Sequence, residues 1–328
     1  MATTHRILPP SPDLEQLRRD AKSLLKALQA GDISARARVH AVASGLPVRL
    51  STAQLVVARE YGVDSWPQLK ELVDRVVAQG TRYDVIGHGY AAYRRPDPRI
   101  AAAIHDALGD ARTVLNIGAG TGSYEPTDRP VLAVEPSTAM AQQRPAHLPP
   151  AVRAVAESLP LADQCVDASM AIMTIQHWTD WRRGLTELRR VTRRRIVLLT
   201  IDVAAEADMW LFADYAPQFL TNDSAEFPLP EVMASFLEVL VDVRVVPVPA
   251  DCTDGMGLSF WSRPETVLDP GARRATSGFA RMDDDEEQAI VDRLAADLSS
   301  GAWDEQYGRL RMLSELDVGL RLVVAELG

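Results

Sequence analysis

The most informative part of the sequence is the segment Val114-Leu115-Asn116-Ile117-Gly118-Ala119-Gly120-Thr121-Gly122. Its first residues are typical of a buried strand, and three closely spaced glycines follow. Glycine lets the backbone turn sharply and bring its N–H groups against a ligand, because no Cβ obstructs the approach. The segment therefore predicts a ligand-binding turn at the end of a strand.

An acidic residue follows the next predicted strand. Residues 131–134 form a short apolar run, and Glu135 and Pro136 come directly after it. A carboxylate can accept hydrogen bonds from two neighbouring hydroxyls, such as those of a ribose. The glycine loop and this acid together predict a nucleoside site, with a ligand-free glycine turn as the alternative.

Two classes of cofactor use a glycine loop of this kind. A dinucleotide needs the spacing G-x-G-x-x-G, with its pyrophosphate at the N-terminus of the helix that follows. Here the third glycine is Gly122, one position early, and Ser123 occupies the usual place. The spacing favours a nucleoside without pyrophosphate, and a nicotinamide oxidoreductase is the rival that it disfavours.

Apolar runs and helical patterns alternate from residue 83 onward. The predicted strands are residues 113–117, 131–134, 152–156, 166–173 and 196–201, and the predicted helices are residues 100–108, 137–143 and 181–191. This alternation predicts an α/β fold with a doubly wound, Rossmann-like and mainly parallel sheet. Residues 241–248 and 258–261 are expected to add an antiparallel edge. Residues 118–130 leave room for only a short helix between the first two strands.

The first 80 residues are predicted to form a small all-α module of four short helices. Ser11 is the expected cap of the first, and Ser51 with Gln54 has the spacing of a capping box. The chain is therefore divided into a helical module, residues 1–80, and a second domain with a C-terminal helical extension, residues 81–328. The module is interpreted either as a packing unit or as a docking unit. If it is a docking unit, its expected partner is a protein.

Composition excludes several classes of function. The 328 residues are 47% hydrophobic and 24% charged, with a net charge of −10, which disfavours nucleic acid as a partner. No apolar run approaches the ~18 residues of a membrane span. The two cysteines, and histidines without paired spacing, give neither a disulfide framework nor a metal site. A cytoplasmic protein with a small-molecule partner is expected.

Residues 83–265 resemble a class I S-adenosylmethionine-dependent methyltransferase of the small-molecule, ubiquinone/menaquinone-methyltransferase-like type. The resemblance rests on the glycine loop and on residues 83–96, 134–137, 156–160 and 173–178. It implies transfer of a methyl group from S-adenosylmethionine to a small organic acceptor. Separately, residues 17–22, 58–62 and 65–67 resemble a helical segment that precedes ankyrin repeats in bacterial proteins, although no repeats follow here.

The resemblance also implies which residues bind the cofactor. The glycine loop, with Asn116, would contact its methionyl part, Glu135 with Pro136 its ribose, and Ala156 with Glu157 its adenine. An aromatic segment that often forms a lid would bring Tyr83, Tyr90 and Arg94 near the cofactor.

Two positions depart from the family pattern. Asn116 stands where the family often has Asp, and Val155 replaces an acid that is common at the adenine edge. These departures motivate an alternative, a non-catalytic protein that binds S-adenosylmethionine or S-adenosylhomocysteine and acts through protein contacts.

The chemistry of the acceptor is less clearly marked. His177 is the candidate base, because it follows the strand at 166–173 and a histidine can take a proton near neutral pH. The competing interpretation is a structural histidine beside Trp178. The aromatic residues of segment 204–240 are expected either to line an acceptor pocket or to pack a cap, and Asp254 and Trp261 to close the same pocket.

Overall fold

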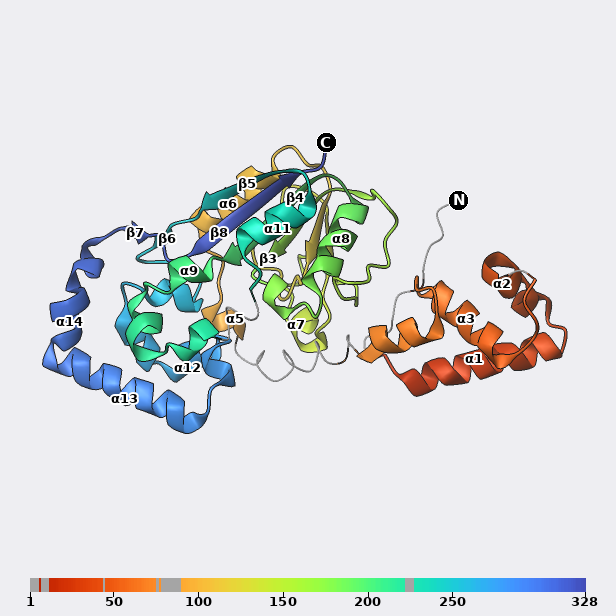
Figure 1. The fold of residues 1–328 in the computed structure, drawn as a ribbon, viewed down its shortest axis with the longest axis horizontal. Coiled ribbons are helices and arrows are strands. Elements are labelled where there is room, and N and C mark those ends of the chain that lie inside the picture. The colour runs from red at the N-terminus through yellow and green to blue at the C-terminus, as the bar shows by residue number, and fades with distance from the viewer. Residues whose placement is uncertain (1–5, 7–11, 44, 75–76, 78–89, 222–226) are drawn as a thin grey trace.

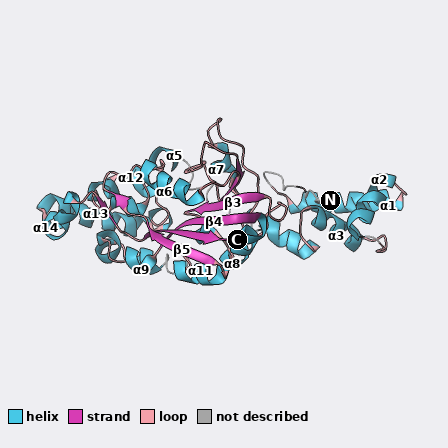
Figure 2. Ribbon diagram, turned by 90° about the horizontal axis from the view of Figure 1, so that it is seen from above, coloured by secondary structure: helices cyan, strands magenta, loops and turns pink. Residues whose placement is uncertain are grey.

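The structure is a computed structural model that describes residues 6, 12–43, 45–74, 77, 90–221 and 227–328. The N-terminal helices lie at one end of an elongated molecule, the sheet lies in the middle, and a helical cap lies at the other end (Figures 1 and 2). This arrangement confirms the predicted fold class. Within the described ranges, no helix has the length and apolar character needed to cross a membrane.

The N-terminal helices are α1 (Leu14–Gln29), α2 (Ile33–Ala43) and α3 (Leu50–Glu60), and residues 66–74 are also helical. The predicted cap Ser11 lies outside the described residues, and Asp13 caps α1 by accepting a hydrogen bond from the backbone of Glu15. The predicted capping box at Ser51 is wrong. The helix begins at Leu50, with the extended Arg49 as its N-cap, two residues before the predicted cap, so Ser51 lies inside the first turn of α3.

The central sheet has the order β2-β1-β3-β4-β8-β5. Its strands are β1 (Val114–Ile117), β2 (Val131–Val134), β3 (Val166–Ile172), β4 (Thr192–Ile201), β5 (Leu240–Val245) and β8 (Leu320–Glu326). The first four are parallel, and β8 runs antiparallel to both β4 and β5. The chain leaves β1 for β2 on one side and returns to β3 on the other. Open α/β sheets bind ligands at such a switch point.

Helices cover both faces of the sheet, because alternate side chains of each strand point to opposite faces. On β4, Val197 and Leu199 belong to the apolar cluster that includes α6 (Pro98–Leu108), whereas Ile196 and Leu198 belong to the cluster of the other face. That second cluster includes α8 (Trp181–Val191) and α11 (Pro230–Leu237), while the short α7 (Thr138–Gln142) follows β2. The predicted helices at 100–108, 137–143 and 181–191 are thus confirmed.

Three details of the predicted sheet are wrong. Residues 152–156 form only isolated bridges, Val134 with Val152 and Val155 with Ser158. Residues 118–130 are turns with no helix, because the loop itself carries the chain from β1 to β2. Residues 257–260 form a 3₁₀ turn, since Phe260 and Trp261 are buried in the cap, and β8 supplies the antiparallel neighbour instead.

The cap is formed by segments that come between β4 and β8 in the sequence. It comprises α9 (Val203–Glu206), a π-helical turn (Leu211–Tyr215), β6 (Val248–Pro249), 3₁₀ turns at Pro264–Leu268, Phe279–Arg281 and Gly308–Met312, α12 (Pro270–Arg274), α13 (Asp284–Ser300), α14 (Ala302–Tyr307) and β7 (Glu315–Leu316). Its core is aromatic: the indole of Trp210 donates to the carbonyl of Trp261 at 2.9 Å, and Trp303 packs edge-on against Trp210. Of the aromatic residues in segment 204–240, all but Phe236 lie in this core, which confirms the cap interpretation.

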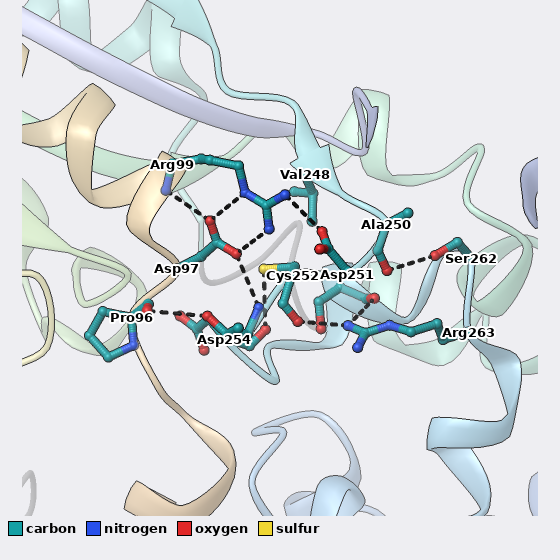
Figure 3. A network of polar contacts seen from close by, with 12 residues as sticks. Pro96, Asp97, Arg99, Val248, Ala250, Asp251, Cys252, Asp254, Ser262 and Arg263 are labelled. Carbon is teal, nitrogen blue, oxygen red and sulfur yellow. Dashed lines mark hydrogen bonds and ion pairs between the residues drawn. The ribbon is translucent and has the colours of Figure 1, made fainter. Parts of the chain in front are cut away.

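A charged latch fastens the cap to the segment between α5 (Tyr90–Tyr93) and α6 (Figure 3). The carboxylate of the fully buried Asp97 accepts from the backbone of Arg99 at 2.9 Å and from that of Thr253 at 3.1 Å. The Arg99 guanidinium also binds Asp97 and reaches Asp251 at 2.7 Å. Burial alone would raise the pKa of Asp97, but the hydrogen bonds from Arg99 and Thr253 outweigh it and hold that pKa at about 2.

Candidate active site

A cavity of about 610 Å³ lies at the carboxyl ends of β1, β2 and β3. Its wall contains residues that directly follow each of these strands: Gly118 after β1, Glu135 after β2 and Met173 after β3. The cavity therefore occupies the switch point of the sheet, and its volume is in the range that holds organic ligands and cofactors.

The glycine loop, residues 118–122, has a backbone conformation that needs glycine. Gly118 and Gly120 have φ angles of +64° and +51°, which are costly for residues with a Cβ. A Cβ at Gly118 would also overlap the side chain of Thr174. The N–H of Ala119 donates to the carbonyl of Val134 at 2.9 Å, so the loop bends toward the end of β2 and presents mainly backbone to the cavity.

Glu135 joins the glycine loop to the end of β2. Its side chain is almost fully buried, at 4% exposure, and its two oxygens accept from the N–H of Gly120 at 2.8 Å and of Ser137 at 2.7 Å. Burial raises the pKa of this carboxyl, against the opposing effect of the two backbone hydrogen bonds. A carboxylate has about four acceptor positions, so two remain for a ligand in the cavity.

A buried polar network lies behind the loop. The amide nitrogen of Asn116 donates to Glu125 at 2.9 Å, and both oxygens of Glu125 accept from the Arg144 guanidinium, at 3.0 and 2.8 Å. The Glu125 and Arg144 side chains are nearly inaccessible to solvent. Sequence reasoning missed this pair, since nothing local marks Arg144, after α7, as the partner of a residue nineteen positions earlier.

The wall after β3 contains the predicted base. His177 lies in a 3₁₀ turn (Ile175–His177) and lines the cavity together with Trp178. Met173 has a φ of +50°, and its carbonyl accepts from the amide of Gln176 at 3.0 Å. Such strain in a non-glycine residue clusters at functional sites. The ring of Trp178 packs so tightly on α8 that a Cβ at Gly184 would overlap it.

The segment after Val152 forms another wall. Ala154 and Ala156 line the cavity, whereas Glu157 does not. One Glu157 oxygen accepts from the backbone and hydroxyl of Thr179, at 2.7 and 2.8 Å, and from the backbone of Asp180 at 3.2 Å. Glu157 therefore anchors the start of α8 to this wall.

The cap closes the remaining side. Asp254 lines the cavity and accepts from Arg94 at 2.5 Å and from the Tyr124 hydroxyl at 2.8 Å. Burial, and then the charge of Asp254, raises the pKa of Tyr124 far above its ordinary value, so this hydroxyl stays protonated. Tyr124, with a φ of +64°, was not among the predicted site residues.

Comparisons with known proteins address the identity of this cavity. A family model described as "Methyltransferase domain" matches residues 115–199. A solved structure from Anabaena variabilis, provisionally assigned as a methyltransferase from an antibiotic biosynthesis pathway, is 32% identical, with a TM-score of 0.66, and the match covers 71% of this chain and 98% of that one. The chain belongs to the class I S-adenosylmethionine-dependent methyltransferases.

Two further solved structures match this methyltransferase more weakly. A possible histamine N-methyltransferase from Thermotoga maritima is 15% identical, with a TM-score of 0.42, over 77% of this chain and 97% of that one. A geranyl diphosphate C-methyltransferase from Streptomyces coelicolor is 13% identical, with a TM-score of 0.40, over 70% and 78%. No curated protein matches the chain.

The methyltransferase cavity brings together most of the predicted site residues. Those that line it are Arg94, Asn116, Gly118, Ala119, Gly120, Thr121, Glu135, Pro136, Ala156 and His177. Gly122 and Glu157 are not in its wall, nor is Trp261, which is buried in the cap core. Tyr83 and the side chain of Tyr90 lie outside the described part of the structure.

The cavity fits the cofactor of this family better than a dinucleotide. S-adenosylmethionine has a ribose diol and no pyrophosphate. Glu135 can accept hydrogen bonds from such a diol, and it lies beside the glycine loop, whose positive φ angles disfavour residues with a Cβ. Residues 118–130 are turns, so no helix N-terminus follows the loop to hold a pyrophosphate. This observation argues against the nicotinamide alternative independently of Ser123.

Proposed function

We propose that this methyltransferase moves a methyl group from S-adenosylmethionine to a small, largely apolar organic acceptor that bears no phosphate. The observation that carries the proposal is the buried carboxylate of Glu135, 2.8 Å from the N–H of Gly120 at the switch point of the sheet. It supports a ribose at Glu135, the methionyl part of the cofactor over the glycine loop with Asn116, and adenine beside Ala154 and Ala156.

The charges around the cavity support an acceptor without phosphate. Among the described lining residues, Arg94 is the only Lys or Arg, and Asp254 neutralises it at 2.5 Å. Among the described lining residues a phosphate group would meet no uncompensated cation, and Lys or Arg side chains with free donors are the ones that commonly bind phosphate. Ile172, Met173 and Trp178 supply an apolar wall instead.

The residues of this chain have mainly a positioning role in the proposed reaction. The bound sulfonium cofactor supplies an already activated methyl group, so holding the acceptor in line at near-attack distance is the protein's main task. His177 is the proposed proton acceptor for an acceptor hydroxyl or protonated amine. Tyr124 is unsuited to that task, because its raised pKa keeps its proton in place.

We also propose the division of the chain into a helical module, residues 1–80, and a catalytic domain, residues 81–328. Three buried apolar clusters support it: one lies mainly within the N-terminal helices, and the other two lie within the sheet and cap. Cys165 and Cys252 are both free, which supports a reducing, cytoplasmic location.

Titration calorimetry with S-adenosylhomocysteine tests the cofactor site. Glu135→Ala should weaken binding by about 1–3 kcal/mol, because ligand hydroxyls lose a buried charged partner. Glu305→Ala, an exposed glutamate on α14, is the matched control and should bind as the wild type does. Equal affinity of the wild type and Glu135→Ala would remove Glu135 from the site.

Turnover is tested by following S-adenosylhomocysteine formation with a panel of phenols, amines and their phosphorylated counterparts. The proposal predicts methylation among the unphosphorylated acceptors. Tight binding of the cofactor without turnover on any of them would favour the non-catalytic binding protein.

A further inference from the structure

The N-terminal helices contact the catalytic domain at Val155. This side chain has 0% exposure and belongs to the apolar cluster of the N-terminal helices, together with Leu69, Leu72 and Val73. Every other buried residue of that cluster comes from the first 73 residues. Val155 is therefore the one point at which a catalytic-domain residue enters the buried core of those helices, within the described chain.

The neighbours of Val155 face the other way. Ala154 and Ala156 line the main cavity and belong to the core of the sheet. Successive side chains in an extended segment point to opposite sides, so one short piece of backbone separates the cavity from the N-terminal helices. The turn closes where the N–H of Ser158 donates to the carbonyl of Val155 at 3.2 Å.

A second, smaller cavity of about 220 Å³ lies beside this contact. Residues 62–64 and Gln68 line it from the N-terminal side, and Glu157, Arg183 and Glu187 are among those that line it from the catalytic domain. Glu157 in turn binds Thr179 at 2.7 Å, and Thr179 lines the main cavity. Ala156 lines the main cavity and its neighbour Glu157 lines the smaller one, so the two cavities are separated by adjacent residues of one turn.

We propose that the N-terminal helical module is part of the cofactor site, with Val155 as the positioning residue through which it holds the wall formed by Ala154 and Ala156. The proposal rests on the proposed function, since it takes this wall to be the adenine side. It also explains why no acid is needed at position 155: the side chain faces an apolar core and not the cavity. Coupling of this kind is reciprocal, so cofactor binding must strengthen docking of the module.

The test compares Val155→Ser, Val155→Ala and Val155→Ile in the full-length chain. The readouts are the affinity for S-adenosylhomocysteine and hydrogen exchange at residues 66–74 and 154–158. Val191→Ser is the matched control, because Val191 is equally buried but belongs to the core of the sheet. The Ala variant serves if the Ser variant does not fold.

Val155→Ser and Val155→Ala should weaken binding by about tenfold, within the usual 5–150-fold range of coupling, and speed exchange at both segments. Val155→Ile should bind as the wild type does, and Val191→Ser should change the affinity less than twofold. In the wild type, saturating S-adenosylhomocysteine should slow exchange at residues 66–74.

Faster exchange at 66–74 with unchanged affinity would overturn the proposal, as would unchanged exchange and affinity in both polar and truncated variants. Failure of the wild type to bind S-adenosylhomocysteine is a different outcome. It would refute the proposed function, and with it the role given to the module.

Discussion

The amide of Asn116 donates to the carboxylate of Glu125 at 2.9 Å, behind the loop that lines the cavity. The Asn116 side chain therefore faces a carboxylate that is already present. Arg144 neutralises this carboxylate by donating to both of its oxygens. The family pattern often has Asp here. In this chain a second acid at position 116 would lie within hydrogen-bond distance of Glu125.

The first prediction concerns this arrangement. Asn116→Asp should destabilise the fold, because two buried carboxylates would share one guanidinium. Glu125→Gln should also destabilise it, by up to the ~3–5 kcal/mol that is typical when one partner of a buried ion pair is lost. The double variant Asn116→Asp/Glu125→Gln restores one acid and one amide, and it should recover much of the loss. Urea denaturation measures all three, and additive losses in the double variant would contradict the account.

The second prediction concerns Gly118. Gly118→Ala should cost more than the ~1–2 kcal/mol of a left-handed residue alone, because its Cβ would also meet the side chain of Thr174. Gly301→Ala is the control: its φ is +82° and nothing lies within 4 Å of the added Cβ. Thermal unfolding of both variants isolates the steric part of the loss. Equal losses would show that the loop has room for a side chain.

The third prediction is the pH dependence of cofactor binding. Ribose hydroxyls donate to the ionised form of Glu135, so affinity should be full above the pKa of this group and decrease as the pH falls through it. Burial raises that pKa above the ordinary value of 4.5, so the decrease should begin at a higher pH than an exposed glutamate would give. Calorimetry with S-adenosylhomocysteine from pH 8 to pH 5 measures it. Glu135→Gln should bind more weakly and without this dependence; an identical profile in both proteins would assign the effect to another group.

The fourth prediction concerns the latch between the cap and the segment before α6. Asp97→Asn should lower the free energy of unfolding at pH 6 by about 1.5–3 kcal/mol, the range for a hydrogen bond to a charged group. The folded pKa of Asp97 is about 2, below its ordinary 3.8, so this contribution is complete above about pH 4 and is lost as the pH falls toward 2. Urea unfolding of both proteins at pH 6 and pH 3 checks the direction. A difference that grows at low pH would contradict it.

The sequence predicts the sheet well where a signal is local. Residues 131–134 and 181–191 coincide with β2 and α8, because an apolar run and a helical stripe mark them. β8 was missed although its apolar pattern is plain, since only tertiary structure brings the last strand between β4 and β5. The apolar pattern of residues 152–156 predicts a strand, but in the structure Val155 is buried against the N-terminal helices.

In the site, too, features marked by local sequence could be predicted and those that depend on distant contacts could not. The glycine loop and Glu135 are recognisable from spacing alone, and residues 118–121 of the loop line the cavity together with Glu135. Tyr124 and Arg144 depend on contacts across 130 and 19 residues of chain. No local pattern records such partners, so they could be found only in the folded structure.

The most direct test of the central claim is a crystal structure of the chain with S-adenosylhomocysteine. The account predicts ligand density along residues 118–122, with both ribose hydroxyls within hydrogen-bond distance of the Glu135 carboxylate and adenine against Ala154 and Ala156. Density in another cavity, or a ribose away from Glu135, would contradict it.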